Sequence, residues 1–337
     1  MNQKAGNIIK FVIFLGIGLF FVYWFLLKLD SDTKQAIWSA VVNADYGWVA
    51  IAMTVSSMAL FVRALRWQLL YRPLGKVPKL RNTFGAVLVA YLANLAFPRL
   101  GEVLRCAVLT TSDDIPIEKS LGTMLTERFI DVAAYFVIIL IGFLVMFSDM
   151  KLWFGEGIAE KFGNSGTTIA FLAAIIIIGI GCILLYLKFR KRLIRHRLFA
   201  KIDSLLVGCV EGIKSIIYLP KRDIAKFIIY SIIIYLCYIL GGLIIFQAFP
   251  ETYGLGFKAA FVAYLFGSVG MVISQGGIGA YPTLFQKALA LYGISLATGN
   301  ACGWVLWSSQ QLIIIVLGLG FTLYFALLKK KNQANKI

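Results

Sequence analysis

Residues 97–105 read Phe97-Pro98-Arg99-Leu100-Gly101-Glu102-Val103-Leu104-Arg105, and they interrupt an otherwise apolar region that extends over residues 82–111. Two arginines and a glutamate therefore stand among residues that would otherwise enter an apolar environment. Charged side chains at membrane depth are costly unless they pair, face a polar cavity or bind a charged ligand. This stretch is both the break that decides the fold and a candidate functional site.

The composition of the whole chain is that of a membrane protein. Hydrophobic residues occupy 60% of the 337 positions, charged residues only 15%, and the mean hydropathy is +0.84. A soluble domain is only about 45–50% apolar. The net charge of +17 does not indicate a nucleic-acid partner, because Lys and Arg cluster in the connections between apolar runs. We therefore expect an all-α polytopic membrane protein that binds no nucleic acid.

The sequence predicts neither a metal site nor a cofactor. Its five cysteines lie mostly within apolar runs and form no CxxC pair, and His196 is the single histidine. Zinc sites and disulfide frameworks need recurring Cys or His spacings that this chain lacks.

Six apolar runs are long enough to cross a bilayer as helices, which takes about 20 residues. They lie near residues 8–27, 46–70, 120–147, 168–188, 224–247 and 300–328. The first run follows Lys4 and Lys10, and we expect it to be a retained helix because no clear cleavage site follows it. A further apolar region, 257–293, is broken like 82–111, here by Ser274-Gln275-Gly276-Gly277-Ile278-Gly279-Ala280-Tyr281-Pro282.

The charges in the connections predict how these runs are oriented. Connection 63–81 has six basic residues and no acid, connection 188–226 has eleven basic and three acidic residues, and the C-terminal tail is also basic. Such connections are usually cytoplasmic. The segments 28–46 and 148–167 each carry three acids against two lysines, which suits the outer side. Both termini are then expected to be cytoplasmic.

Regions 82–111 and 257–293 must then each return to the side from which they enter, since a single crossing would place a basic segment outside. Region 82–111 is too short for two spans, so we expect a re-entrant helical hairpin. Region 257–293 could be a hairpin or two short spans. The single integral membrane domain, 1–337, would have about six full transmembrane helices and two broken hairpins in inverted halves, 8–147 and 168–328. Many transporters share this architecture.

The first break offers an anion site. Gly101 and Glu102 open a new helix after Pro98, so backbone N–H groups and the positive end of the helix dipole would face the interior. Arg99 and Arg105 add guanidinium groups, whose planar fork suits phosphate oxygens. An alternative stays open, in which these arginines and Glu102 form a structural ion network that locks the hairpin.

A second polar group follows in the sequence Thr126-Glu127-Arg128-Phe129-Ile130-Asp131. Glu127 and Asp131 lie four positions apart, on one helical face, and two carboxylates there repel each other unless a cation lies between them. A hairpin arginine or an amine-bearing headgroup could be that cation. The carboxylates could instead simply neutralise the hairpin arginines, or one could titrate in a proton-coupled cycle. Arg128 belongs to the same candidate substrate-binding group.

Two more groups complete the candidate set. The second break permits a tight turn and close approach of its backbone to a ligand, and its candidate residues are Gln275, Gly276, Gly277 and Gly279. Arg63, Arg66 and Trp67 end the second apolar run. Arg and Trp at a cytoplasmic boundary usually anchor to lipid headgroups, and a role in substrate entry is the alternative.

Taken together, these residues resemble the lysylphosphatidylglycerol synthase transmembrane family, also called flippase-like membrane proteins. The resemblance extends over roughly residues 8–328 and rests on Arg63-x-x-Arg66-Trp67, Pro98-Arg99-x-Gly101-Glu102-x-x-Arg105, Glu127-Arg128-x-x-Asp131 and Gly276-Gly277-x-Gly279. In full-length members that the chain resembles, such a membrane region moves aminoacylated phosphatidylglycerol across the bilayer, and a separate soluble domain makes that lipid. This sequence ends nine residues after Leu328, so we expect no synthetic domain here and a separately encoded lipid synthase as a candidate partner.

The resemblance implies a lipid translocase in a bacterial cytoplasmic membrane. It would move a phospholipid, with aminoacylated or amine-bearing lipids among the candidates, between leaflets through a central polar cavity. One alternative is a carrier of polyprenyl phosphate or a polyprenyl-linked glycan. Another is an intramembrane enzyme that modifies lipid, which is disfavoured because no Ser/His, Cys/His or metal-ligand set is recognised. We therefore expect a transporter and not an enzyme, and the sequence does not predict the oligomeric state.

Overall fold

The structure of the chain is a computed structural model, and it describes residues 31–97, 99–147 and 219–334. The predicted spans 8–27 and 168–188 lie outside the described residues, as does most of the basic connection 188–226. The chain divides into two compact units, one formed by Met1–Met124 with Leu219–Ile337 and the other by Leu125–Tyr218. Most of the described helices belong to the first unit.

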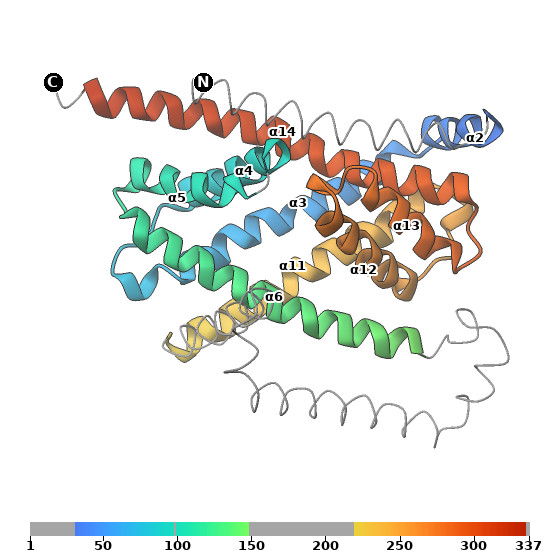
Figure 1. The fold of residues 1–337 in the computed structure, drawn as a ribbon, viewed down its shortest axis with the longest axis horizontal. Coiled ribbons are helices and arrows are strands. Elements are labelled where there is room, and N and C mark those ends of the chain that lie inside the picture. The colour runs from blue at the N-terminus through green and yellow to red at the C-terminus, as the bar shows by residue number, and fades with distance from the viewer. Residues whose placement is uncertain (1–30, 98, 148–218, 335–337) are drawn as a thin grey trace, which may run out of the picture. The chain divides into compact units, whose positions relative to one another are not determined.

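The described residues form nine α-helices, and no strand occurs among them (Figure 1). This confirms the all-helical prediction for this part of the chain. The helices are α2 (Ser31–Val42), α3 (Tyr46–Leu69), α4 (Leu80–Ala96), α5 (Leu100–Asp113), α6 (Ile117–Phe147), α11 (Lys221–Ile245), α12 (Phe257–Ile273), α13 (Ala280–Ala290) and α14 (Leu296–Ala334).

Three of the described helical segments are long and apolar enough to cross a membrane. They are Tyr46–Leu74, Lys221–Ala248 and Leu296–Leu328, and they match the predicted spans 46–70, 224–247 and 300–328. Helix α6 covers the predicted span 120–147 as one continuous helix.

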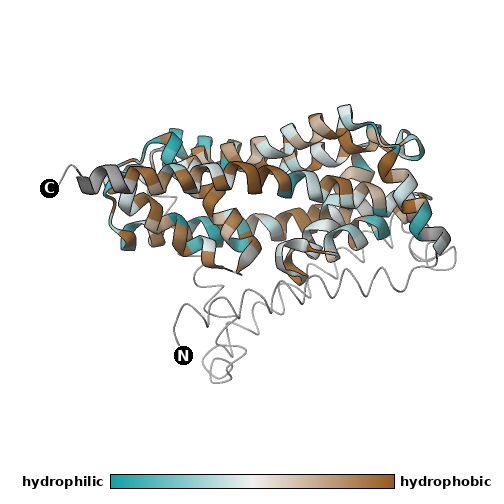
Figure 2. Ribbon diagram, turned by 90° about the horizontal axis from the view of Figure 1, so that it is seen from above, coloured by the Kyte–Doolittle hydropathy of each residue, from teal (hydrophilic) through white to brown (hydrophobic). Residues whose placement is uncertain are grey.

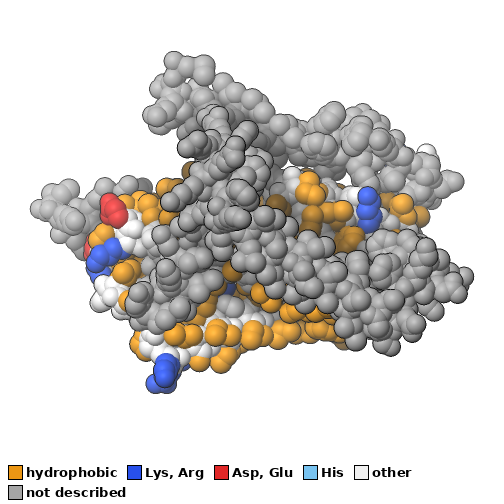
Figure 3. Space-filling view, turned by 60° about the horizontal axis from the view of Figure 1, so that its bottom comes forward, with side chains coloured by type: hydrophobic (Ala, Val, Ile, Leu, Met, Phe, Trp, Pro, Cys, Tyr) orange, Lys and Arg blue, Asp and Glu red, His pale blue; other side chains and the backbone are white. Residues whose placement is uncertain are grey.

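Much of the exposed surface of the described helices is apolar. Apolar residues continue along the middle of the helices, whereas hydrophilic residues gather mostly toward the helix ends (Figure 2). The described surface in Figure 3 is likewise largely apolar, with Lys and Arg side chains at a few places. On α14, for example, Leu323 and Leu327 are exposed. Large exposed apolar surfaces are unfavourable in water, so these surfaces suit contact with lipid.

Helices α3 and α11 form a central antiparallel pair in the first unit. At one end of the pair, the backbone N–H of Asp45 donates to the carbonyl oxygen of Ala248 at 3.0 Å. At the other end, Arg72 forms an ion pair with Asp223 in the first turn of α11. The two contacts fix which ends of the two helices lie together.

Helix pairs α4–α5 and α12–α13 are hairpins whose open ends are each held by a carboxylate. At the first, Asp113, the last residue of α5, accepts hydrogen bonds from the Lys79 backbone N–H at 3.1 Å and the Asn82 side-chain amide at 2.9 Å. At the second, Glu251 before α12 accepts hydrogen bonds from the backbone N–H and the hydroxyl of Ser295, at 2.5 and 2.8 Å. Each hairpin therefore brings the chain back to the end from which it enters.

The two hairpins start at opposite ends of the α3–α11 pair. The first follows the end marked by Arg72, through the 3-10 turn η1 (Arg72–Leu74), and the second follows the end marked by Ala248, through the 3-10 turn η3 (Pro250–Thr252). Their tips meet, because a Cβ added to Gly276 would lie only 3.1 Å from a methyl carbon of Leu95 at the end of α4. Two breaks that are nearly 180 residues apart in sequence thus lie side by side.

Close backbone packing explains why glycine stands at the first tip. A Cβ on Gly101 would lie 1.9 Å from the carbonyl oxygen of Ala90, so only glycine lets α5 approach α4 this closely. The Gly101 N–H donates to the side-chain oxygen of Asn94 at 2.8 Å. The predicted new helix after the proline is confirmed, since α5 begins at Leu100 with Arg99 as its N-cap residue.

Tyr281 packs the interior of the second hairpin. A Cβ on Gly267 would lie 2.7 Å from its ring, and one on Gly270 would lie 2.7 Å from its backbone. Pro282 stands in the first turn of α13, as predicted, because this position needs no backbone N–H donor.

Candidate functional site

The arginine pair on α3 is buried. Arg63 is 7% exposed, and Arg66 and Trp67 are 0% exposed. These side chains therefore face protein, which corrects the prediction that they anchor to lipid headgroups at the membrane boundary. The sequence rule failed because it treats the end of a span as a boundary, whereas here the hairpins and α11 pack around it. Their predicted role in substrate entry stays a prediction.

Each arginine of the α3 pair meets groups on neighbouring helices. The Arg66 guanidinium donates to the hydroxyl of Ser231 on α11 at 3.0 Å and lies 5.1 Å from the centre of the Phe227 ring. The hydroxyl of Tyr238 on α11 lies close to Arg63 and to Tyr91 on α4. The pair thus bridges α3 to α11 and, through Tyr91, to the first hairpin.

Arg105 brings the first hairpin into the same interior. It is 1% exposed, and its guanidinium carbon lies 4.3 Å from the centre of the Trp67 ring, within the range of a cation–π interaction. The Trp67 indole N–H donates to the hydroxyl of Thr123 in α6 at 3.1 Å, and the Tyr71 ring meets the indole edge-on at 5.4 Å. Arg63 and Arg66 on α3 and Arg105 on α5 are thus all buried, and they are called the arginine cluster below.

The other predicted residues of the first break are placed differently. Arg99 is exposed and adopts a positive φ of 66° at the turn between α4 and α5. Glu102 is half-buried in the first turn of α5. The Gly101 N–H, which was predicted to face an anion, is bonded to Asn94. Arg105, one turn further along the helix, is therefore the buried cation of this hairpin.

The predicted group on α6 belongs to the second unit. Glu127 is 0% exposed, whereas Arg128 and Asp131 are half-buried. A fully buried carboxylate in a membrane protein needs compensation by a cation or by hydrogen bonds. Neutralisation of the hairpin arginines by Glu127 and Asp131 stays a prediction.

The second break forms the tight turn predicted for it. Gly276, Gly277 and Gly279 have φ values of 62°, 78° and 73°, which L residues with side chains rarely adopt. Gln275 begins the 3-10 turn η4 (Gln275–Gly277). The indole N–H of Trp307 on α14 donates to the Gly276 carbonyl oxygen at 2.8 Å. This bond ties the turn to α14.

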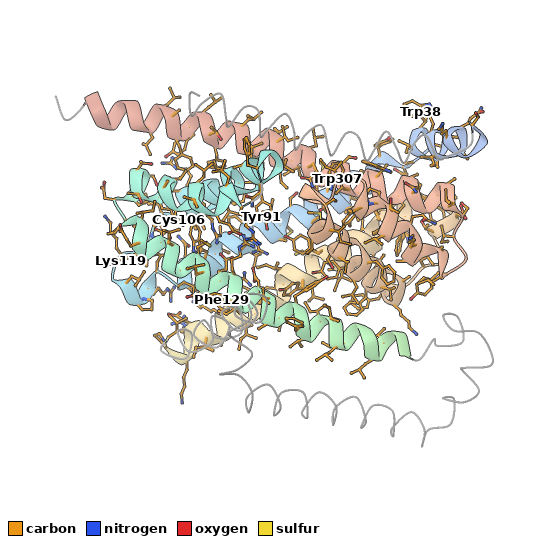
Figure 4. The ribbon with its side chains drawn as sticks, in the orientation of Figure 1. Trp38, Tyr91, Cys106, Lys119, Phe129 and Trp307 are labelled. Carbon is orange, nitrogen blue, oxygen red and sulfur yellow. The ribbon has the colours of Figure 1, made fainter. Side chains whose placement is uncertain are left out.

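A polar segment on α14 was missed by the sequence interpretation. It lies near the second break, and it reads Trp307-Ser308-Ser309-Gln310-Gln311 within the long apolar span. Polar groups inside a span usually face the protein interior, and that rule would have singled it out. Figure 4 labels Tyr91 on α4, Cys106 on α5 and Trp307 on α14, the helices that build this interior. Among the described residues, no group of three or more His, Cys, Asp or Glu is placed to hold a metal ion.

Comparison with known proteins assigns the chain to a family. The model of the lysylphosphatidylglycerol synthase TM region matches residues 7–320. The chain belongs to this family. As a member of the lysylphosphatidylglycerol synthase TM region family with three helices able to span a membrane among its described residues, it is a polytopic integral membrane protein.

Individual relatives are distant. The UPF0104 membrane protein MJ1595 of Methanocaldococcus jannaschii is 25% identical over 145 residues, which are 42% of each chain. The glycosyltransferase AglD of Haloferax volcanii is 29% identical over 107 residues, which are 32% of this chain and 17% of that protein. The matches thus span less than half of the length of these curated relatives. No solved structure matches the chain.

Proposed function

We propose that this protein is a lipid translocase that moves a phospholipid headgroup between the leaflets of a membrane. The observation that carries the proposal is Arg105, which is buried on a hairpin that returns to its own end and lies against buried Trp67. Arg63 and Arg66 are buried on the adjoining helix α3. Charged side chains inside a membrane-spanning unit are costly, and they commonly mark a substrate pathway.

The chemistry of this cluster suits a phosphate. Guanidinium groups bind phosphate oxygens through paired, charge-assisted hydrogen bonds, and arginine keeps its charge when it is buried. In the proposed mechanism, the lipid phosphate binds the arginine cluster while the acyl chains of the lipid stay in the membrane.

The hairpins supply the element that would move. With 14 and 11 residues, α5 and α13 are about 21 and 16 Å long at 1.5 Å per residue, less than the roughly 30 Å of a hydrocarbon core. Because the hairpins start at opposite ends of the α3–α11 pair and meet at Gly276 and Leu95, we propose that they are re-entrant and that they form an inverted repeat. Alternating exposure of two such halves is how many transporters work.

A reconstitution experiment tests this function. Proteoliposomes would contain labelled phosphatidylglycerol, and the rate at which label from the inner leaflet reaches an external quencher would be measured. We expect Arg105→Ala to slow translocation by roughly 10- to 100-fold, because one charge-assisted hydrogen bond contributes about 1.5–3 kcal/mol. Arg105→Lys should retain part of the rate, since it keeps the charge and loses the planar fork.

Arg81→Ala is the matched control. Arg81 is an exposed arginine at the start of α4, where its guanidinium lies 4.7 Å from the centre of the Tyr324 ring. Its removal should leave the rate unchanged. Full translocation by the Arg105→Ala variant would remove this residue, and with it the phosphate site, from the proposal.

A second candidate function is a carrier of polyprenyl phosphate or of a polyprenyl-linked glycan. The similarity to a protein named as a glycosyltransferase favours it. A carrier of a phosphate-linked sugar would need the same phosphate site as a phospholipid translocase. Native mass spectrometry of the lipid that co-purifies with the protein separates the two functions by lipid mass. An intramembrane lipid-modifying enzyme would instead convert purified lipid to a new product without a partner.

A further inference from the structure

The face of α14 that contacts the hairpin tips carries a buried glutamine. Trp307 bonds to Gly276 in the second break, and Ile314 packs with Leu60 and Leu88, a cluster against which Leu95 also packs. Gln311 lies four residues after Trp307 and three before Ile314, so it shares their helical face. Its side chain therefore lies on the stretch of α14 that faces the meeting point of the two tips.

Gln311 has an incomplete set of hydrogen bonds. The residue is 7% exposed, and its side-chain oxygen Oε1 is buried without a hydrogen-bond partner. Buried polar atoms in native proteins are nearly always satisfied, and one that is not calls for an explanation. Gln311 Oε1 is thus a buried acceptor near the two tips that can still take a hydrogen bond from a ligand.

The chemistry around Gln311 indicates the kind of donor. An amide side chain can both accept and donate hydrogen bonds, as a hydroxyl can, whereas an ammonium group only donates. Asn94 places a second amide side chain next to Leu95 at the first tip. Trp307 adds an aromatic ring at the second tip. A buried ammonium group would need an anionic partner, and Gln311, Asn94 and Trp307 are all uncharged, so an uncharged, hydroxyl-bearing group fits them better.

We propose that Gln311, with Trp307, binds the hydroxyl groups of a lipid headgroup such as glycerol or a sugar, and that the headgroup reaches them when the hairpin tips separate. This inference rests on the proposed function, because the phosphate of the same lipid would bind the arginine cluster. It assigns the specificity for the headgroup to α14 and the affinity for the phosphate to α3 and α5.

Lipid binding to the purified full chain in detergent tests the inference. The probes are phosphatidylglycerol, phosphatidylethanolamine and phosphatidic acid with identical acyl chains, and titration followed by native mass spectrometry gives the affinities. The wild-type protein should bind phosphatidylglycerol about 5- to 10-fold more tightly than the other two. Gln311→Met, which is similar in length and apolar, should abolish this preference and leave the affinity for phosphatidic acid unchanged. Ser308→Ala, at an exposed position of α14 that is neither three nor four residues from Trp307 or Ile314, should keep the preference.

The outcomes separate the inference from the function on which it rests. Equal affinities of the wild-type protein for phosphatidylglycerol and phosphatidic acid would overturn the hydroxyl site. This comparison uses the wild-type protein alone, so it does not depend on whether a variant folds. A preference of the wild-type protein for phosphatidylethanolamine would also overturn it. So would an unchanged preference for phosphatidylglycerol in Gln311→Met, because Gln311 Oε1 would then bind only a water. The phosphate site fails separately, if Arg105→Ala binds all three lipids as tightly as the wild type does.

Discussion

The central carbon of the Arg105 guanidinium lies 4.3 Å from the centre of the Trp67 ring, and both residues are almost completely buried. Trp67 belongs to α3, Arg105 to α5, and the hydroxyl that accepts the indole N–H belongs to Thr123 of α6. One side chain thus connects three helices and fixes the position of the buried cation.

Loss of the hydrogen bond from the Trp67 indole N–H to the Thr123 hydroxyl should destabilise the protein, because the group that remains is buried without its partner. In Trp67→Phe the Thr123 hydroxyl loses its donor, and in Thr123→Val the indole loses its acceptor, so each change should cost about 1–3 kcal/mol of unfolding free energy. The double variant should cost clearly less than the sum of the two, because the second change removes the group that the first left unsatisfied. Unfolding in mixed micelles gives the three free energies, and strict additivity would show that the bond contributes nothing.

Gly101→Ala should strongly destabilise the first hairpin. The added Cβ would lie 1.9 Å from the Ala90 carbonyl oxygen, and backbone atoms cannot move aside as a flexible side chain can. We expect a loss of about 3 kcal/mol or more, the upper range for overpacking. Gly122→Ala on α6 is the matched control, since a Cβ there meets nothing within 4 Å and alanine favours a helix by about 1 kcal/mol. Thermal unfolding in detergent should show a lower midpoint for the first variant only.

The breaks and the helices could be predicted from the sequence, but the surroundings of the arginines could not. Proline and spaced glycines are local signals, so the turns at Arg99 and Gly276 could be read directly from the chain. The burial of Arg66 depends on α11, which lies more than 150 residues away and contributes Ser231. Gln311 escaped notice because the apolar residues around it dominate any average over the span.

The second hairpin should weaken in acid. Although burial raises the pKa of Glu251, hydrogen bonds from Thr298 and Ser295 outweigh it and hold the pKa below its ordinary value of 4.5. A carboxyl whose pKa is lowered on folding stabilises the protein above its unfolded pKa, and this stabilisation is lost as the pH falls through the folded value. Glu251→Gln should therefore lower the unfolding midpoint at pH 7, and the gap to wild type should shrink as the pH falls below about 4.5. A gap that stays constant from pH 7 to pH 3 would contradict this.

The charges of the loops and the contacts of the hairpins together predict which positions share a side of the membrane. Lys76 precedes the first hairpin, Gly254 precedes α12 and Ala290 ends α13, and all three positions are exposed. If the second hairpin is re-entrant, cysteines at Gly254 and Ala290 should react with a membrane-impermeant maleimide from the same, outer side, and a cysteine at Lys76 should react only from the cytoplasmic side.

Each new cysteine is introduced into a variant in which the native cysteines are replaced by serine. A separate variant that retains Cys106 as its single cysteine is the buried control, and it should not react. Full-length protein in intact cells and in inverted vesicles presents opposite faces to the reagent. Labelling of Ala290→Cys from the same side as Lys76→Cys would mean that residues 257–293 cross the membrane an odd number of times. In that case the hairpins would not enter from opposite sides, and alternating exposure around their tips would lose its structural basis.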